Sequence, residues 1–182
     1  MDFSKTPLEG LIAITPKVFT DARGGFFETY SKKDFAAAGI NADFVQDNQS
    51  YSKRGVIRAL HLQRAPHAQA KLVRVLQGRV FDVVVDLRPQ SKTFGQWYGV
   101  ELSCQNNKML FIPRGLAHGF SVLSEAAVFG YKCDNFYNKE SEAGIIYNDP
   151  DLNIDWRVAG QDAVVSDKDK LLPSFKAYKE TL

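Results

Sequence analysis

The feature that most constrains the fold is a series of eight short segments between residues 44 and 132, each rich in apolar residues that alternate with polar ones or run together. Turn residues separate the segments at intervals of roughly ten residues, which is typical of a β-sandwich or β-barrel. An antiparallel sheet closed into a jelly roll avoids long exposed edges and encloses a central cavity for a small ligand. The predicted strands span residues 44–51, 56–63, 71–76, 79–87, 96–102, 108–113, 118–123 and 127–132.

The predicted strand at 79–87 has two unlike faces. Every second residue from Phe81 to Leu87 is apolar, whereas Asp82 and Asp86 lie on the opposite face. Because successive side chains of a strand point to opposite faces, one face is expected to meet the core and the other to meet solvent or ligand. Gly78, just before this strand, predicts a tight turn of the hairpin type, since glycine tolerates a positive φ.

Helical segments are few and short. Residues 31–40 predict one helix, capped by Ser31 and ended by Gly39, and the residues after Ser166 predict the start of another. A length of 182 residues suits one well-filled core and is too short for two comfortable domains. We therefore expect a single all-β domain over residues 1–182, with a few short peripheral helices.

The charge balance and the cysteines restrict the partners. Lys+Arg of 23 against Asp+Glu of 21 gives a formal net charge of +2, far from the strongly basic balance of a nucleic-acid-binding protein. Cys104 and Cys133 lack metal-type spacing and favour reduced thiols in the cytoplasm. No apolar run reaches membrane-spanning length, and the first ten residues lack the pattern of a secretion signal. We expect a cytoplasmic protein that binds neither nucleic acid nor a membrane.

Common cofactor and nucleophile motifs are missing from the sequence. It contains no G-x-G-x-x-G after a strand, no Walker lysine loop, no H-E-x-x-H and no G-x-S-x-G. Any chemistry then has to come from side chains. Most candidates lie in GVIRALHLQRAPHAQAKLVRVLQG (55–78) and in FIPRGLAHGF (111–120), where histidines and basic residues stand among strand-like residues.

Both stretches resemble the two conserved boxes of the cupin superfamily. Gly55 and His61 match the start of the first box, but Gln63 and Lys71 stand where a metal-binding cupin has its next histidine and its glutamate. A protonated lysine has no lone pair to donate and repels a cation, whereas a transition-metal site usually needs three or four N or O ligands. We therefore expect a cupin-type jelly roll without a metal, in which His61 and His118 have another role.

An ordered set of blocks extends the comparison along the chain: FTDARGGFFETY, FVQDNQS, IRALHLQ, QAKLVRVLQGRVFDVVVDLR, TFGQWYGVELS, FIPRGLAHGF, FGYKC, YNDPDLNIDW and SDKD. Together they make the chain similar to the dTDP-4-dehydrorhamnose 3,5-epimerase family over nearly its full length. The resemblance implies a jelly roll and a homodimer that needs neither metal nor nicotinamide. It also implies inversion of C3 and C5 of dTDP-4-dehydro-6-deoxy-D-glucose, which gives dTDP-4-dehydro-L-rhamnose for dTDP-rhamnose biosynthesis.

The resemblance also implies catalytic roles. His61 is the base, because a neutral imidazole accepts a proton near physiological pH. Lys71 lies by the C4 ketone oxygen, where its positive charge stabilises the enolate that forms when a neighbouring carbon loses a proton. Tyr131 matches the proton donor on the opposite face, and Asp169 matches the carboxylate that orients His61.

Substrate binding is carried over in the same way, with Tyr137 matching the ring that stacks on thymine. The segment from Arg23 to Glu28, which includes Phe26, is expected to complete the site of the partner chain in a homodimer. The resemblance implies that Arg23, Arg58 and Lys168 bind the diphosphate and sugar. It implies that Glu28, Gln46, Asp47 and Asn48 bind the nucleotide, and that His118 and Glu142 complete the pocket wall.

Three of these residues also fit ordinary structural roles. Asp169 stands three residues after Ser166, as in the capping box of a helix start. Tyr131 shares its strand face with residues expected to be in the core, and His118 fits a hydrogen-bonded residue at a strand start. Each role therefore has a structural alternative.

Strict alternation places Arg58 and His61 on opposite faces of one strand, although both are expected to contact one substrate. A bulge or bend near Arg58 would reconcile them. Ala59, beside the base, replaces a glycine that is common in the family and leaves open how many carbons are inverted. Three alternatives follow: a mono-epimerase acting at C3 or C5 alone, a non-catalytic cupin that binds a sugar nucleotide, and a metal-dependent cupin.

Overall fold

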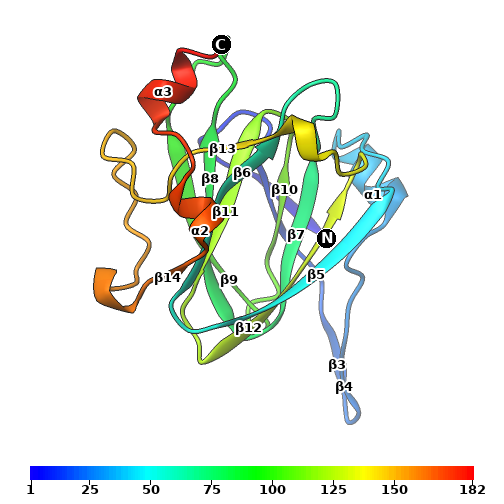
Figure 1. Cartoon of the computed structure of the whole chain (residues 1–182). Coiled ribbons are helices and arrows are strands. Elements are labelled where there is room, and N and C mark those ends of the chain that lie inside the picture. Colours follow the sequence, from blue (N-terminus) through cyan, green and yellow to red (C-terminus); the bar gives the residue numbers. More distant parts are fainter.

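The computed structural model describes residues 1–182, and two six-stranded sheets form its body (Figure 1). The first sheet contains β1 (Asp2–Lys5), β2 (Ile12–Thr15), β5 (Gln46–Lys53), β7 (Lys71–Gln77), β10 (Met109–Ile112) and β12 (Ala126–Cys133). The second contains β6 (Val56–Gln63), β8 (Arg79–Asp86), β9 (Trp97–Ser103), β11 (Leu116–Val122), β13 (Glu142–Gly144) and β14 (Val164–Val165). The strand orders are β1-β2-β10-β7-β12-β5 and β13-β6-β11-β8-β9, with β14 parallel to β6.

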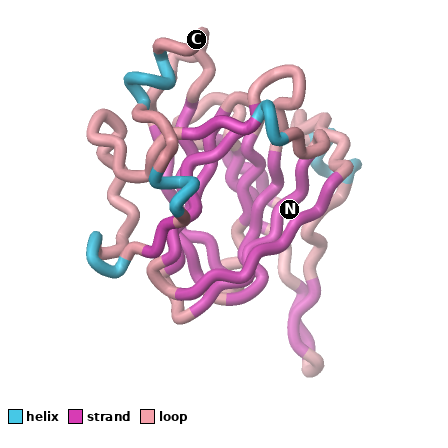
Figure 2. Tube along the Cα trace, viewed as in Figure 1, coloured by secondary structure: helices cyan, strands magenta, loops and turns pink.

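Helices are confined to short peripheral pieces, as Figure 2 shows. They are α1 (Lys32–Ala37), α2 (Asp167–Lys170) and α3 (Phe175–Lys179), with 3-10 turns at η1 (Lys139–Ser141) and η2 (Gly160–Asp162). All eight predicted strands are present, so the all-β fold with few helices is confirmed. Where the sequence predicts one helix after Ser166, the structure has two short ones, α2 and α3. The break between them arises because Pro173 disfavours helical backbone at the residue before it and Ser174 caps the second helix.

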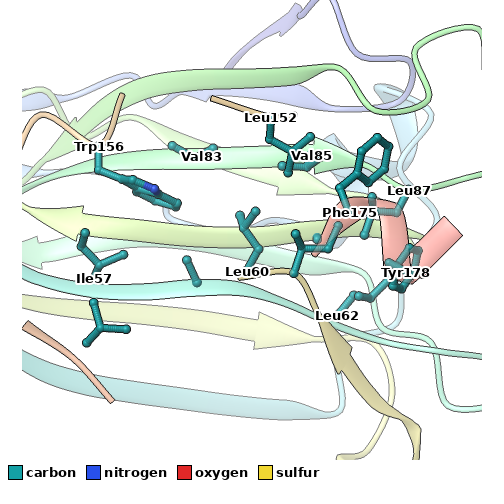
Figure 3. Close-up of a cluster of buried hydrophobic side chains, with 14 of the residues drawn as sticks. Ile57, Leu60, Leu62, Val83, Val85, Leu87, Leu152, Trp156, Phe175 and Tyr178 are labelled. Atoms are coloured by element: carbon teal, nitrogen blue, oxygen red, sulfur yellow. The ribbon is translucent and has the colours of Figure 1, made fainter. Parts of the chain in front are cut away.

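The two faces of β8 lie in two different cores. Val80 and Val84 pack between the sheets against residues such as Val73 of the first sheet. Phe81 and Val83 point the other way, into a cluster covered by the C-terminal segment. Figure 3 shows this second cluster, in which Trp156, Phe175 and Tyr178 accompany strand residues of the second sheet.

The prediction for β8 is therefore wrong in one respect. Its alternation is present, but neither face meets bulk solvent, since Asp82 and Asp86 are both 0% exposed. The face that carries the carboxylates points into the space between the sheets. The C-terminal segment buries the wholly apolar face, since Trp156, Phe175 and Tyr178 pack in one cluster with it.

Gly78 makes a tight turn, but not a hairpin. Its φ of 81° has the predicted positive sign. However, the strands that it connects belong to different sheets, since β7 pairs with β10 and β12 whereas β8 pairs with β11 and β9. Gly78 is thus a corner between the sheets, where a Cβ atom would collide with the carbonyl oxygen of Ala126.

A two-stranded hairpin of β3 (Phe19–Asp21) and β4 (Gly24–Phe26) extends away from the body of the protein, as Figure 1 shows. Its large side chains have no cover within this chain, since Phe19 is 56% exposed and Phe26 is 68% exposed. Exposed aromatic residues on a projecting segment are typical of a contact with another protein surface.

Candidate active site

A cavity of about 550 Å³ opens between the two sheets. A smaller cavity of about 290 Å³ adjoins it, and the two share the side chains of His61, Lys71, Tyr131 and Glu142. The larger cavity is also lined by Arg58, His118, Lys168 and Asp169, and the smaller one by Gln46, Asn48 and Tyr137. Most of the residues expected to act on or bind the substrate therefore meet in one place, contributed by both sheets and α2.

A β-bulge in β6 brings Arg58 and His61 to the same cavity. His118 of β11 pairs with His61, but Phe120, two residues on, pairs with Arg58, three residues back. The extra residue in β6 shifts the alternation of side chains, so that Arg58 and His61 point to the same face. This is the irregularity that the sequence predicts, since strict alternation would place them on opposite faces. Gly119 lies at the bulge, where a Cβ atom would sit 2.6 Å from the Cβ of Ala59.

His61 is held by Asp169 of α2. The Nε2 atom of His61 lies 2.8 Å from Oδ1 of Asp169, and the backbone N–H of Ala59 donates to Oδ2 at 3.3 Å. Because an ionised carboxylate only accepts hydrogen bonds, this contact places the imidazole hydrogen on Nε2 and leaves the lone pair on Nδ1. Burial opposes ionisation of Asp169, but its hydrogen bonds with His61 and Ala59 outweigh burial and hold the pKa below its ordinary value.

Asp169 makes only one of the two hydrogen bonds of the capping box that the sequence offers as an alternative to its catalytic role. Ser166 caps α2 by accepting a hydrogen bond from the backbone N–H of Asp169 at 3.1 Å. The reciprocal bond of a capping box would join the Asp169 carboxylate to the backbone N–H of Ser166, but that carboxylate binds His61 and Ala59 instead. The helix cap thus places the carboxylate, and the carboxylate places His61.

A second histidine–carboxylate pair lies deeper in the molecule. Nε2 of His118 is 2.9 Å from Oδ2 of Asp82, and the Asp82 side chain is 0% exposed. Its other oxygen, Oδ1, has no hydrogen-bond partner. His118 is thus both a hydrogen-bonded strand residue and part of the cavity wall. The sequence offers one signal for Asp82, a carboxylate inside an otherwise apolar run, but the alternation alone assigns it no partner.

Lys71 lies at the start of β7 and faces the cavity from the first sheet. Burial lowers the pKa of its ammonium group, while the carboxylates of Asp82 and Glu142 act in the opposite direction. Its Nζ atom lies 5.9 Å from the centre of the Tyr131 ring. Burial raises the pKa of the Tyr131 hydroxyl, so this group is a neutral proton donor at physiological pH.

Tyr131 departs from its neighbours in β12. Ala127 and Phe129, which share its parity, are buried in the core between the sheets, whereas Tyr131 is partly buried and lines both cavities. Its strand therefore passes from core to cavity within a few residues.

Three polar side chains meet where the two cavities join. Oε2 of Glu142 accepts hydrogen bonds from the Tyr137 hydroxyl at 3.1 Å and from Nζ of Lys168 at 2.6 Å. Burial alone would raise the pKa of Glu142, but the bonds with Lys168 and Tyr137 hold it below its ordinary value. Glu142 is therefore ionised and ties the Tyr137 loop to α2.

Four residues of the expected binding set lie away from this cavity. Asp47 lies on the outer side of the sheet, where its carboxylate pairs with Nζ of Lys132 at 2.6 Å. Arg23, Phe26 and Glu28 lie on or just after the projecting hairpin, and the Arg23 side chain is 90% exposed and paired with Asp21. Within one chain these residues do not meet His61, and their service to a partner's site stays a prediction.

No three His, Cys, Asp or Glu side chains are grouped so that they could hold a metal ion. No helix is both long enough and apolar enough to cross a membrane. Cys104 and Cys133 are both free, as the sequence predicts.

Comparisons with known proteins agree on one family. The family model described as dTDP-4-dehydrorhamnose 3,5-epimerase matches residues 5–177. A Shigella flexneri protein of that name is 51% identical over 170 residues, which cover 93% of each chain. The crystal structure of the Elizabethkingia anophelis NUHP1 enzyme of that name is 56% identical, with a TM-score of 0.94 over 97% of each chain.

A further solved structure contains a ligand. It is a dTDP-6-deoxy-D-glucose-3,5-epimerase from Legionella pneumophila Philadelphia 1 in complex with dTDP-4-keto-L-rhamnose. It is 46% identical to this chain, has a TM-score of 0.91, and is matched over 96% of this chain and 93% of its own. The fold and the arrangement of the strands are therefore shared across these proteins, including one with a bound nucleotide sugar.

Proposed function

This chain belongs to the dTDP-4-dehydrorhamnose 3,5-epimerase family and is an epimerase that inverts C3 and C5 of dTDP-4-dehydro-6-deoxy-D-glucose, and we propose that it does so in the cavity shared by His61, Lys71 and Tyr131. One observation carries this assignment of the site. His61 belongs to the second sheet and Tyr131 to the first, and both face one cavity between the sheets. A sugar ring held between them has a base on one face and an acid on the other, as inversion requires.

The first step is removal of the proton from the carbon next to the C4 ketone. Nδ1 of His61 accepts that proton, since Nε2 is engaged by Asp169. The ionised Asp169 then stabilises the imidazolium, which has a hydrogen on each nitrogen. Proton transfer to a positioned base of this kind contributes about 10²–10⁴-fold to the rate.

The second requirement is stabilisation of the enolate oxygen at C4. Lys71 supplies a positive charge in the cavity between the sheets, where charge stabilisation is stronger than in bulk water. The lysine stands where a metal-binding cupin has a carboxylate ligand. We propose that its ammonium group acts on the carbonyl oxygen directly.

The last step returns a proton to the opposite face of the ring. Tyr131 remains neutral because burial raises the pKa of its hydroxyl, so it has a proton to give. The same three groups act at C3 and at C5, because both carbons adjoin the C4 ketone and acquire acidity from it.

The nucleotide end of the substrate extends toward the mouth of the cavity. Arg58 and Lys168 line the larger cavity and supply positive charge for the diphosphate, while Gln46, Asn48 and Tyr137 line the smaller cavity and suit the nucleoside. We further propose a cytoplasmic homodimer in which Arg23, Phe26 and Glu28 of the projecting hairpin complete the partner's site. The exposure of Phe19 and Phe26 supports this arrangement.

Isotope exchange in deuterated water tests the proposal. The enzyme is incubated with dTDP-4-dehydro-6-deoxy-D-glucose, and deuterium at C3 and C5 is followed by NMR. We expect label at both carbons, and His61→Asn should abolish exchange while the affinity for dTDP remains close to that of the wild type. Label at one carbon alone would identify a mono-epimerase, and exchange that survives in His61→Asn would reject the assignment of the base.

A further inference from the structure

Two carboxylates on the same face of β8 have opposite surroundings. Asp86 accepts hydrogen bonds from the Nε and Nη2 atoms of Arg88 and from the hydroxyl groups of Ser91 and Thr93. Asp82, four residues earlier and equally buried, is bonded only to His118, and its Oδ1 atom has no partner. Buried polar atoms are nearly always satisfied, so an orphaned carboxylate oxygen calls for an explanation.

We propose that Asp82 is a positioning residue for the epimerase reaction, which fixes the ring of His118 through Nε2 and keeps Lys71 in its ammonium form beside the C4 oxygen. This inference rests on the proposed function of the cavity. Asp82 touches neither the substrate nor the cavity surface, and it acts through His118 and Lys71, both of which line the cavity.

The groups around Lys71 show why Asp82 is needed. Cys133 of β12 lies near Lys71, but burial raises the pKa of its thiol and keeps it neutral. Glu142 of β13 is ionised, but Lys168 and Tyr137 already share its charge at the cavity mouth. Asp169 of α2 also lines the cavity and is ionised, but its two oxygens are engaged by His61 and the backbone N–H of Ala59. The other titratable groups of the lining are Arg58, His61, His118, Tyr131 and Lys168, none of which is an anion at physiological pH.

Asp82 is therefore the carboxylate left to balance Lys71, with His118 at its Oδ2 atom and no donor at its Oδ1 atom. Burial lowers the pKa of the Lys71 ammonium group, and a deprotonated amine would give no positive charge to an enolate. The negative charge of Asp82 opposes that shift. Attraction between buried charges is only weakly screened by salt or solvent, so a carboxylate behind the cavity wall acts on Lys71 without touching it.

The position of Asp82 also reduces the stability of the fold. Burial raises the pKa of its carboxyl group, because only His118 and Lys71 offset the loss of water around the charge. An ionised carboxylate in such a place lowers the free energy of unfolding above the ordinary pKa of an aspartate. A neutral residue of the same shape should therefore be tolerated by the fold, although it removes the charge that Lys71 requires.

The test is Asp82→Asn, with Asp86→Asn as the matched control on the same strand face. For Asp82→Asn we expect kcat to fall about 10–100-fold with KM close to wild type, as when a supporting charge or donor is removed from an active site. The alkaline limb of the kcat–pH profile should move to lower pH, because Lys71 loses its proton more easily. The melting temperature should equal or exceed that of the wild type.

The control should behave in the opposite way. Asp86→Asn removes a carboxylate with several partners, so the melting temperature should fall while kcat and its pH profile stay unchanged. If Asp82→Asn does not yield folded protein, Asp82→Ser provides the same measurement, since its hydroxyl can accept from His118 without a charge.

Three results would overturn the proposal. They are a kcat for Asp82→Asn within a factor of two of wild type, an alkaline limb that does not move, or a loss of activity that merely follows a lower melting temperature. The His61→Asn variant separates the two levels of inference. If it abolishes exchange while Asp82→Asn is fully active, the function of the cavity stands and the role of Asp82 does not.

Discussion

The two histidine–carboxylate pairs of the cavity have similar geometry and opposite electrostatics. His61 and Asp169 are 2.8 Å apart, and the His61 side chain is 29% exposed. His118 and Asp82 are 2.9 Å apart, and the His118 side chain is 8% exposed. The pKa of Asp169 lies below its ordinary value and that of Asp82 lies above it. The distance between the atoms therefore does not determine what such a pair can do.

The difference comes from the backbone around each carboxylate. Asp169 stands in the first turn of α2, where the N–H of Ala59 in the β6 bulge reaches its second oxygen. Asp82 lies mid-strand in β8, where the backbone groups are occupied by pairing with β9 and β11, so its second oxygen has no donor. In the His61–Asp169 pair both carboxylate oxygens have donors, which suits a base that gains and loses a proton in each turnover. In the His118–Asp82 pair one oxygen has no donor, which suits a fixed charge.

The largest effect is expected for Asp169→Asn. The amide NH₂ group can donate to Nε2 of His61, which moves the ring hydrogen to Nδ1 and removes the lone pair that accepts the substrate proton. We expect kcat to fall by about 10³–10⁴-fold, as when the orienting aspartate of a catalytic triad is replaced by asparagine. Steady-state kinetics and deuterium exchange both measure this loss. A reduction below about tenfold would mean that Asp169 serves mainly as a helix-cap residue.

The next effect belongs to Lys71, on which the buried pair is proposed to act. Lys71→Met keeps much of the side-chain volume and removes the charge, so kcat should fall by about 10²–10³-fold, as for loss of an oxyanion-stabilising group. In this background Asp82→Asn should cause little further loss, because its effect depends on the lysine. A double-mutant cycle that gives simple additivity would break the link between the two residues.

The stability of the protein at acid pH should separate Asp86 from Asp82. Despite burial, hydrogen bonds from Arg88, Ser91 and Thr93 lower the pKa of Asp86 to about 2. Because this value is below that of the unfolded chain, ionised Asp86 stabilises the fold above about pH 4, and the contribution is lost as the pH falls toward about 2. It amounts to about 2 kcal/mol at neutral pH.

The contribution of ionised Asp82 to the free energy of unfolding should have the opposite sign, because its raised pKa makes the ionised form unfavourable in the fold. Urea unfolding at pH 7 should show Asp86→Asn less stable than the wild type by about 2 kcal/mol, and the gap should narrow below about pH 4. Asp82→Asn should show no such deficit at pH 7. Equal losses for both variants would remove the electrostatic distinction between them.

The sequence predicts the strands well and their connections less well. Each alternating segment from 44 to 132 is a strand, because burial on one or both faces requires that pattern. The short strands β1 to β4, β13 and β14 are not predicted, since two to four residues carry too little alternation. Gly78 shows the limit at a corner: its positive φ is predictable, but which sheet the chain enters next depends on contacts distant in the sequence.

The site shows the same division. The conflict between Arg58 and His61 predicts an irregular strand, and β6 contains the bulge. Asp82 is visible in the sequence only as a charge in an apolar run. Its partner His118 lies 36 residues away on a neighbouring strand, and only the register of β8 against β11 brings them together. The placing of Arg23 in a partner's site depends on a second chain, which one sequence pattern does not determine.

The smallest effect should come from Glu142, which faces both pairs. Its charge acts on His61 and on Lys71, but Lys168 and Tyr137 share it, and its side chain is 23% exposed. We expect Glu142→Gln to move the alkaline limb of the kcat–pH profile in the same direction as Asp82→Asn but by less. The change in kcat should stay within about threefold, because partly exposed ion pairs contribute little. A shift as large as that of Asp82→Asn would make the cavity mouth, rather than the buried pair, the source of the charge that holds the Lys71 proton.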